Sequence, residues 1–220
     1  MRCRLPSLTV SLALPLLFLT AGCTDAATPE PTPEEALYLR FCAVCHGADG
    51  RTVPGMASTP HLNSQGLLTV VDDAFLTASI ARGRPGENGR DKPGTKMSVY
   101  GEEHGGPLSS EEIAQIVRHV RTWQTAPSVE LPPYRARGDP DNGRTVYTLC
   151  VPCHGQDGWS TTAPSLAGRT LQETASDAFL RHAVLHGRPG TAMPGFRLSE
   201  QDLADLIAFV RTLYQPAVRP

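Results

Sequence analysis

The feature that most constrains this chain is a five-residue pattern, C-x-x-C-H, that occurs twice in 220 residues. The two copies consist of Cys42, Cys45 and His46, and of Cys150, Cys153 and His154. Two thiols three positions apart lie on one turn of a helix, and the histidine next to them projects from the same side. Such thiols add to the two vinyl groups of a haem while the imidazole binds its iron. The pattern therefore predicts two covalently bound haem c groups, each with one iron.

Other uses of paired cysteines fit the pattern less well. A thioredoxin-like C-x-x-C follows a strand and has no need of a histidine after both copies. A zinc site needs four ligands that converge, whereas the two pairs lie far apart in the sequence. A disulfide within C-x-x-C closes a very small loop and adds little stability. Covalent haem uses all four cysteines of the two motifs and leaves none unpaired.

The two motifs belong to a longer internal repeat. The aligned blocks are 41–50 with 149–158, 73–86 with 177–190, and 108–123 with 198–213. A proline-rich stretch separates the copies and has the composition of a linker. We expect this organisation along the chain: a signal peptide at 1–22, a lipidated N-terminus and proline-rich tether at 23–33, a first domain at 34–125, the linker at 126–138, and a second domain at 139–215.

The first 22 residues have the features of a secretory signal peptide, with two arginines ahead of an apolar run from Leu5 to Leu19. A run of about 15 residues that contains two prolines is too short for a membrane-spanning helix, which needs roughly 20. The sequence L-T-A-G-C, which ends at Cys23, resembles the lipobox of bacterial lipoproteins, although Thr20 stands where leucine is usual. We therefore expect an exported protein that is lipid-anchored through Cys23 to the periplasmic face of a bacterial membrane. A plain periplasmic or secreted protein is the alternative.

Each copy carries the pattern of three helices. The first helix begins at Thr32-Pro33 or Asp139-Pro140, where a capping residue precedes a proline, and runs into the cysteine motif. Another helix begins at Asp73 or Asp177. The closing helices have apolar residues at the i, i+3, i+4, i+7 spacing of one buried face, namely Ile113, Ile116, Val117 and Val120, and Leu203, Leu206, Ile207 and Val210. The expected fold is all-α, with two small tandem domains, each wrapped on a covalent haem.

Each iron needs a sixth ligand, and each copy offers a methionine after the haem motif. Met193 is the only methionine of the second copy. In the first copy Met56 competes with Met97, but Met56 lies in residues that the second copy lacks, whereas Met97 holds the repeat position. We therefore predict that Met97 and Met193 bind the two irons, opposite His46 and His154. Histidine and methionine together close both axial positions and raise the reduction potential, which suits the transfer of single electrons.

With these motifs the chain resembles a class I c-type cytochrome duplicated in tandem, a diheme bacterial cytochrome c. The resemblance covers residues 34–214. It implies helical domains on haem, and it implies that the backbone carbonyls of Pro60 and Pro164 receive the ring N–H of the haem-binding histidines. Two features depart from the pattern. Tyr147 stands three residues before its cysteine whereas Tyr38 stands four before, and only the first copy has the insertions 87–94 and 98–107.

The composition and the motifs together set the expected function. A formal net charge of −2 provides no basic surface for nucleic acid, so we expect no nucleic-acid partner. We expect electron transfer, as a membrane-tethered carrier or as the cytochrome subunit of a respiratory or photosynthetic complex, with redox proteins or that complex as partners. The alternative is a diheme redox enzyme, such as a peroxidase, an oxidase or a thiosulfate-type dehydrogenase. An enzyme needs an iron with an open or displaceable ligand, and both copies offer methionine, so a carrier is favoured.

Overall fold

The computed structural model of the chain describes residues 30–55, 59–84, 97–160 and 163–214. The regular elements within these residues are all helices, so the all-α prediction is confirmed. Outside the helices, β-type backbone pairing in the described residues is limited to two isolated bridges. They join Arg84 with Met97 and Gly101 with Leu108. No helix in these described ranges is long and apolar enough to cross a membrane.

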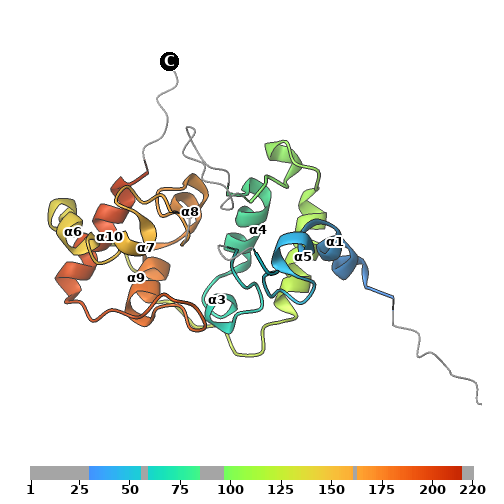
Figure 1. The fold of residues 1–220 in the computed structure, drawn as a ribbon, viewed down its shortest axis with the longest axis horizontal. Coiled ribbons are helices and arrows are strands. Elements are labelled where there is room, and N and C mark those ends of the chain that lie inside the picture. Colours follow the sequence, from blue (N-terminus) through green and yellow to red (C-terminus); the bar gives the residue numbers. More distant parts are fainter. Residues whose placement is uncertain (1–29, 56–58, 85–96, 161–162, 215–220) are drawn as a thin grey trace, which may run out of the picture. The chain divides into compact units, whose positions relative to one another are not determined.

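The elements follow the repeat (Figure 1). The first copy contains α1 (Pro33–Phe41), α2 (Ala43–His46), α3 (Gln65–Leu68), α4 (Asp73–Arg82), the 3-10 helix η1 (Glu102–His104) and α5 (Ser110–Arg121). The second copy contains α6 (Pro140–Tyr147), α7 (Val151–His154), α8 (Arg169–Thr174), α9 (Asp177–His186) and α10 (Glu200–Thr212). The three helices expected in each copy are present, and a short helix precedes the middle one of the three in both.

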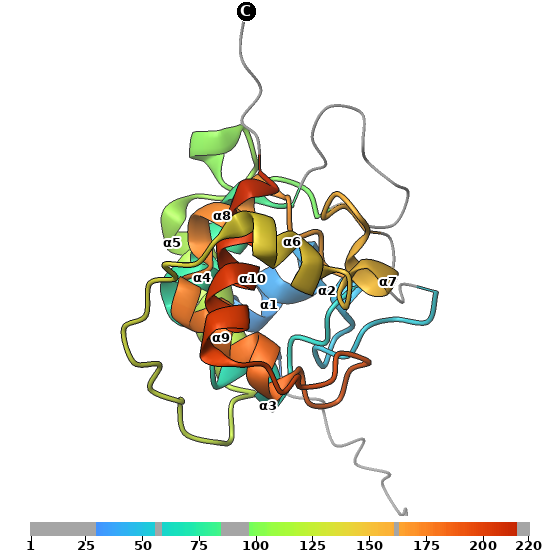
Figure 2. The same ribbon diagram turned by 90° about the vertical axis from the view of Figure 1, so that its left-hand side faces the viewer.

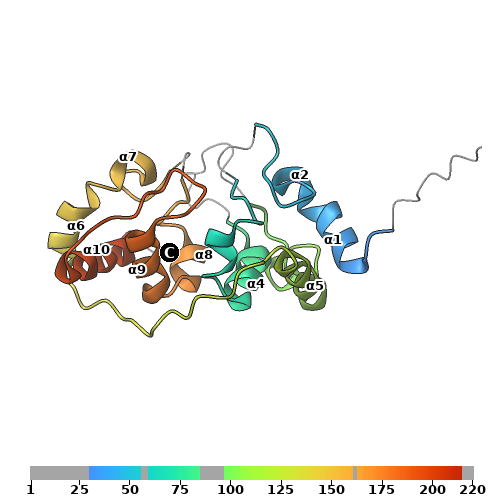
Figure 3. The same ribbon diagram turned by 90° about the horizontal axis from the view of Figure 1, so that it is seen from below.

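The first and last helices of each copy pack against each other, α1 against α5 and α6 against α10. Figure 2 and Figure 3 show α6 next to α10. The two predicted apolar stripes of α5 and α10 form this packing surface, and none of their eight side chains is more than 7% exposed. Gly143 permits the close approach of α6 and α10, because a Cβ at this position would lie only 1.9 Å from the Asp205 carbonyl oxygen.

The predicted helix starts are confirmed, whereas the first helix ends earlier than expected. Thr32 accepts a hydrogen bond from the Glu35 amide at 3.2 Å, and Asp139 accepts one from the Asp141 amide at 2.9 Å. A proline occupies the first turn of both helices. The chain then leaves the helix at Cys42, and the short helix α2 carries the rest of the motif. The motif therefore sits on its own helical turn rather than on the end of a long helix.

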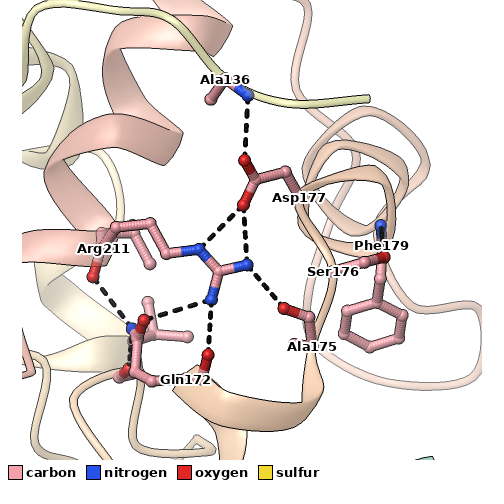
Figure 4. Close-up of polar contacts among 9 residues, drawn as sticks. Ala136, Gln172, Ala175, Ser176, Asp177, Phe179 and Arg211 are labelled. Carbon is pink, nitrogen blue, oxygen red and sulfur yellow. Dashed lines mark hydrogen bonds and ion pairs between the residues drawn. The ribbon is translucent and has the colours of Figure 1, made fainter. Parts of the chain in front are cut away.

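An arginine near the end of α10 joins this helix to the chain around the start of α9 (Figure 4). The Arg211 Nε and Nη2 atoms lie 2.8 and 2.7 Å from Asp177 Oδ1. The same guanidinium donates to the carbonyls of Gln172 and Ala175 at 3.0 and 2.5 Å. Asp177 in turn accepts a hydrogen bond from the Ala136 amide at 2.9 Å, so the contact also fixes the linker.

The first copy contains the same arrangement around Arg121. Its Nε lies 2.7 Å from Asp73 Oδ1, and its Nη atoms donate to the carbonyls of Leu68 and Val71 at 2.6 and 2.7 Å. Because each arginine bonds one carboxylate and two carbonyls at equivalent positions of the repeat, the duplication extends from the sequence to the tertiary contacts.

Candidate functional site

The four cysteines of the two motifs are not joined in disulfides in the structure. Burial, reinforced by the neighbouring Cys45, raises the pKa of Cys42 to about 12. Burial and the neighbouring Cys153 raise the pKa of Cys150 to about 11. Redox-active C-x-x-C pairs have the opposite property, because a lowered pKa supplies their reactive thiolate. The protein environment of these thiols is thus unlike that of a thioredoxin-type site.

The two motif histidines are buried and are held in the same way. His46 Nδ1 lies 3.2 Å from the carbonyl oxygen of Pro60, and His154 Nδ1 lies 3.0 Å from that of Pro164. A carbonyl oxygen can only accept a hydrogen bond, so Nδ1 carries the proton and Nε2 keeps its lone pair. Burial lowers the pKa of both histidines and outweighs the opposing effect of the carbonyl. Each imidazole therefore presents a neutral Nε2, which is the form that binds a metal.

The tyrosines before the two motifs occupy equivalent places although their spacing to the cysteine differs. The Tyr38 hydroxyl donates to the Gly47 carbonyl at 2.7 Å, and the Tyr147 hydroxyl donates to the Gly155 carbonyl at 2.9 Å. The Cys42 amide bonds to the carbonyl four residues back, whereas the Cys150 amide bonds to the carbonyl three residues back. The turn before the cysteine is therefore one residue shorter in the second copy, which compensates for the shorter spacing between tyrosine and cysteine. The rings also contact equivalent partners, since the Tyr38 ring lies 5.0 Å from that of His119 and the Tyr147 ring lies 5.0 Å from that of Phe209.

The glycine after each histidine lets the chain fold back over the motif. Gly47 and Gly155 have φ values of 75° and 76°, in the left-handed region that favours glycine. A Cβ at these positions would lie 2.0 Å from the Arg51 carbonyl oxygen and 2.2 Å from that of Trp159. Any other residue would push away the loop that leads to the proline carbonyl.

The methionines predicted as ligands occupy matching positions in the two copies. The Met97 carbonyl accepts a hydrogen bond from the Arg84 amide at 2.8 Å, and the Met193 carbonyl accepts one from the Arg188 amide at 3.0 Å. Both side chains are partly exposed. In each repeat, one hydrogen bond thus joins the motif histidine to a proline carbonyl, and another joins the methionine carbonyl to an arginine amide. The placement of the two sulfur atoms opposite the histidines stays a prediction.

Part of the insertion that only the first copy possesses packs beside its cysteine motif. The Tyr100 hydroxyl donates to the carbonyl of Phe41 at 3.0 Å, and the rings of these two residues are 6.3 Å apart. Phe41 directly precedes Cys42, so the 98–107 segment is attached to the first motif. The insertion 87–94, the competing Met56 and the lipidation candidate Cys23 lie outside the described residues.

The donor set of each motif fits a covalent haem. Each offers two cysteine sulfurs for thioether bonds and one buried imidazole whose Nδ1 is already fixed by a carbonyl. Within the residues that the structure describes, no three His, Cys, Asp or Glu side chains lie close enough to hold a metal ion among themselves.

Family models match the chain in two separate segments. The model described as "Cytochrome c" matches residues 35–124. The model described as "Cytochrome C oxidase, cbb3-type, subunit III" matches residues 138–210.

Three individual cytochrome proteins are similar in sequence to parts of this chain. A cytochrome c-553-like protein of Synechocystis sp. is 33% identical over 78 residues, which make up 35% of this chain and 71% of that protein. A cbb3-type cytochrome c oxidase subunit CcoP of Rubrivivax gelatinosus is 26% identical over 188 residues, or 82% of this chain and 54% of the relative. Cytochrome c55X of Stutzerimonas stutzeri is 42% identical over 60 residues, or 26% of this chain and 52% of the relative. The chain thus spans about half the length of the last two.

A solved structure has the same fold. It is a chain of the Kuenenia stuttgartiensis reducing HAO-like protein complex, with a TM-score of 0.50 at 21% identity, and the match covers 84% of this chain and 98% of that one.

Proposed function

The chain belongs to the cytochrome c family, and we propose that it is an electron carrier in which each repeat holds one covalent haem c. The observation that carries this proposal is the identical arrangement of the two motifs. In both, two cysteines outside any disulfide precede a buried histidine whose Nδ1 is held by a proline carbonyl. A single site would suffice for a one-electron carrier, and two sites allow electrons to pass along one chain.

Four residues would hold the two irons in this proposal. His46 and Met97 would bind the iron of the first repeat, and His154 and Met193 that of the second. When bound, the haem supplies an iron that takes up and releases one electron. The Pro60 and Pro164 carbonyls fix the orientation of the imidazoles and increase their strength as ligands. The methionine thioethers favour ferrous iron and close the last coordination position.

The same proposal assigns the rest of the chain to delivery and attachment. Residues 34–125 and 139–215 form the two haem domains, and residues 126–138 connect them. Residues 1–22 direct export, and Cys23 carries a lipid that anchors the protein to the periplasmic face of a membrane, with residues 23–33 as a tether.

A membrane-bound redox complex, or a small redox protein that docks with one, is the proposed partner. The support comes from the Rubrivivax relative, which is named as a subunit of a cbb3-type oxidase and is similar over 82% of this chain.

Carbon monoxide distinguishes a carrier from the alternative diheme enzyme. We expect the visible spectrum of the reduced holoprotein to stay unchanged when carbon monoxide is added, because histidine and methionine close both axial positions of each iron. Stoichiometric binding of carbon monoxide to either haem of the unmodified protein would show an open or displaceable ligand. That result would contradict the carrier and favour the enzyme.

A further inference from the structure

The segments that carry the two methionines differ at one matched position, three residues after each methionine, where the first repeat has Tyr100 and the second has Phe196. The Tyr100 amide donates to the carbonyl of Ile80 in α4 at 3.3 Å. The Phe196 amide donates to the carbonyl of Val184, at the aligned position of α9, at 2.9 Å. The two segments are thus attached to α4 and α9 in the same way, and the aromatic side chains differ by one hydroxyl group.

That hydroxyl joins the methionine segment of the first repeat to its cysteine motif. It donates to the carbonyl of Phe41 at 3.0 Å, and Phe41 directly precedes Cys42. Burial, and then the neighbouring cysteines of the motif, raise the pKa of Tyr100, so the hydroxyl keeps its proton and remains the donor. Phe196 has no hydroxyl, so its side chain cannot make this bond to Leu149, the counterpart of Phe41.

The chain that follows Tyr100 folds back and covers it. The Leu108 amide donates to the Tyr100 carbonyl at 2.8 Å, and the Glu102 amide donates to the Leu108 carbonyl at 2.8 Å. A Cβ at Gly106 would lie only 2.2 Å from the carbonyl carbon of Tyr100, so the two backbone segments are in close contact. The residues between them belong to the insertion 98–107, which only the first repeat has. Tyr100 is therefore held by α4, by the insertion and by the cysteine motif.

The first motif is also more covered than the second. Cys42 is buried, whereas Cys150 at the aligned position is half-buried. Phe41 is half-buried and packs against the core, whereas its counterpart Leu149 is 54% exposed. The position that Tyr100 covers in the first repeat is therefore exposed to solvent in the second.

A ligand from solution replaces an axial methionine only when the methionine segment moves away from the iron. Each hydrogen bond between that segment and the rest of the fold opposes this movement. The exchange is easier at oxidised iron, because a thioether favours the ferrous state.

We propose that Tyr100 is a positioning residue that holds Met97 on the first haem. A nitrogen ligand such as imidazole then displaces Met193 from the oxidised second haem before it displaces Met97 from the first. This inference rests on the proposed function, because it requires both haems and both methionine ligands.

The test titrates the oxidised, full-length holoprotein with imidazole and follows the absorption band that arises from thioether bound to iron. Covalent haem and this band are measured first in the unmodified protein, and the absence of either would refute the proposed function and the inference with it. Met193→Ala leaves a band from the first haem alone, and Met97→Ala leaves one from the second haem alone. We expect the band of the first haem to require more imidazole than the band of the second.

Tyr100→Phe removes the hydroxyl and gives the first repeat the residue that the second already has. In the Met193→Ala background we expect the band to disappear at a concentration of imidazole about fivefold lower. This factor corresponds to about 1 kcal/mol, the typical contribution of one hydrogen bond. In the Met97→Ala background the band of the second haem should not respond to Tyr100→Phe. The matched control Tyr134→Phe removes a hydroxyl from the linker and should leave both titrations unchanged.

Three results would overturn the inference in a protein that contains both haems. The first is a titration of Tyr100→Phe that equals that of Tyr134→Phe. The second is an equal shift at both haems, because a general loosening of the fold would then be responsible. The third is an equal requirement for imidazole in Met193→Ala and Met97→Ala, a comparison that does not depend on the folding of a tyrosine variant.

Discussion

Alanine substitution of one methionine at a time tests the assignment of the axial ligands. We expect Met97→Ala to abolish the absorption band that arises from thioether bound to iron in the first haem, to open that iron to carbon monoxide and to lower its potential. Met193→Ala should do the same to the second haem alone. Met56→Ala is the matched control and should leave both haems unchanged. Visible and near-infrared spectra with and without carbon monoxide decide the matter. The reverse result for Met56 and Met97 would show that the repeat alignment is misleading.

The two repeats differ at His119, whose counterpart in the second repeat is Phe209. Its ring packs 5.0 Å from the rings of Tyr38 and Trp123, and its Nε2 is buried without a hydrogen-bond partner. Phe209 occupies the equivalent position and packs 5.0 Å from Tyr147. We expect His119→Phe to stabilise the protein by about 1 to 3 kcal/mol, because it removes a buried polar atom that has no partner. Chemical denaturation measures the difference.

The gain from His119→Phe should grow as the pH falls. Burial lowers the pKa of His119, against the smaller opposing effects of Glu35 and Glu34. Below about pH 6.5 the unfolded chain takes up the proton before the folded one does, so the unmodified protein loses stability there and the variant does not. Phe209→His is the matched reverse substitution and should destabilise. A gain that is independent of pH would show that His119 is not protonated on unfolding.

At the scale of the elements, Arg121 and Arg211 hold the closing helices in place. Arg211→Gln should lower the free energy of unfolding by about 2 to 3 kcal/mol, because it leaves a carboxylate and two carbonyls without their partner. Arg121→Gln should cost less, because the Asp73 side chain is 71% exposed whereas that of Asp177 is 16% exposed. Hydrogen exchange measured by mass spectrometry locates the loss in α8 to α10 or in α3 to α5. Equal losses in both repeats for either variant would contradict this assignment.

The sequence predicted the elements whose pattern is local. The starts of α1 and α6, where a capping residue precedes a proline, and the buried stripes of α5 and α10 follow from patterns within one segment. The structure confirms both features. The arginine–carboxylate contacts of Arg121 and Arg211 were missed, because their partners lie 48 and 34 positions away. Their recurrence at aligned positions of the repeat was a signal that could have indicated them.

The difference at the tyrosines shows another limit of prediction from spacing. Tyr38 and Tyr147 differ by one position in sequence and still reach equivalent glycine carbonyls, because the turn at Cys150 is tighter than the turn at Cys42. The histidine–proline contacts were expected from the family resemblance, and the structure contains both.

For the whole molecule, we expect Cys23 to attach the protein to a membrane. We expect Cys23→Ser to release the holoprotein into the soluble fraction, because the lipid proposed at this cysteine is then lost. Fractionation of cells at high salt and without partner proteins measures the change. A variant that remains with the membrane under those conditions would show that another segment anchors it.

The mass of the intact, denatured protein tests whether the chain carries two covalent haems, because only covalent attachment survives denaturation. We expect the mature protein to carry the mass of two haems. Replacing both cysteines of one motif by serine, in Cys42→Ser with Cys45→Ser or in Cys150→Ser with Cys153→Ser, should leave the mass of one haem. A mature protein with no haem mass, or with a single haem that either double variant retains, would show that the two motifs do not each bind a haem.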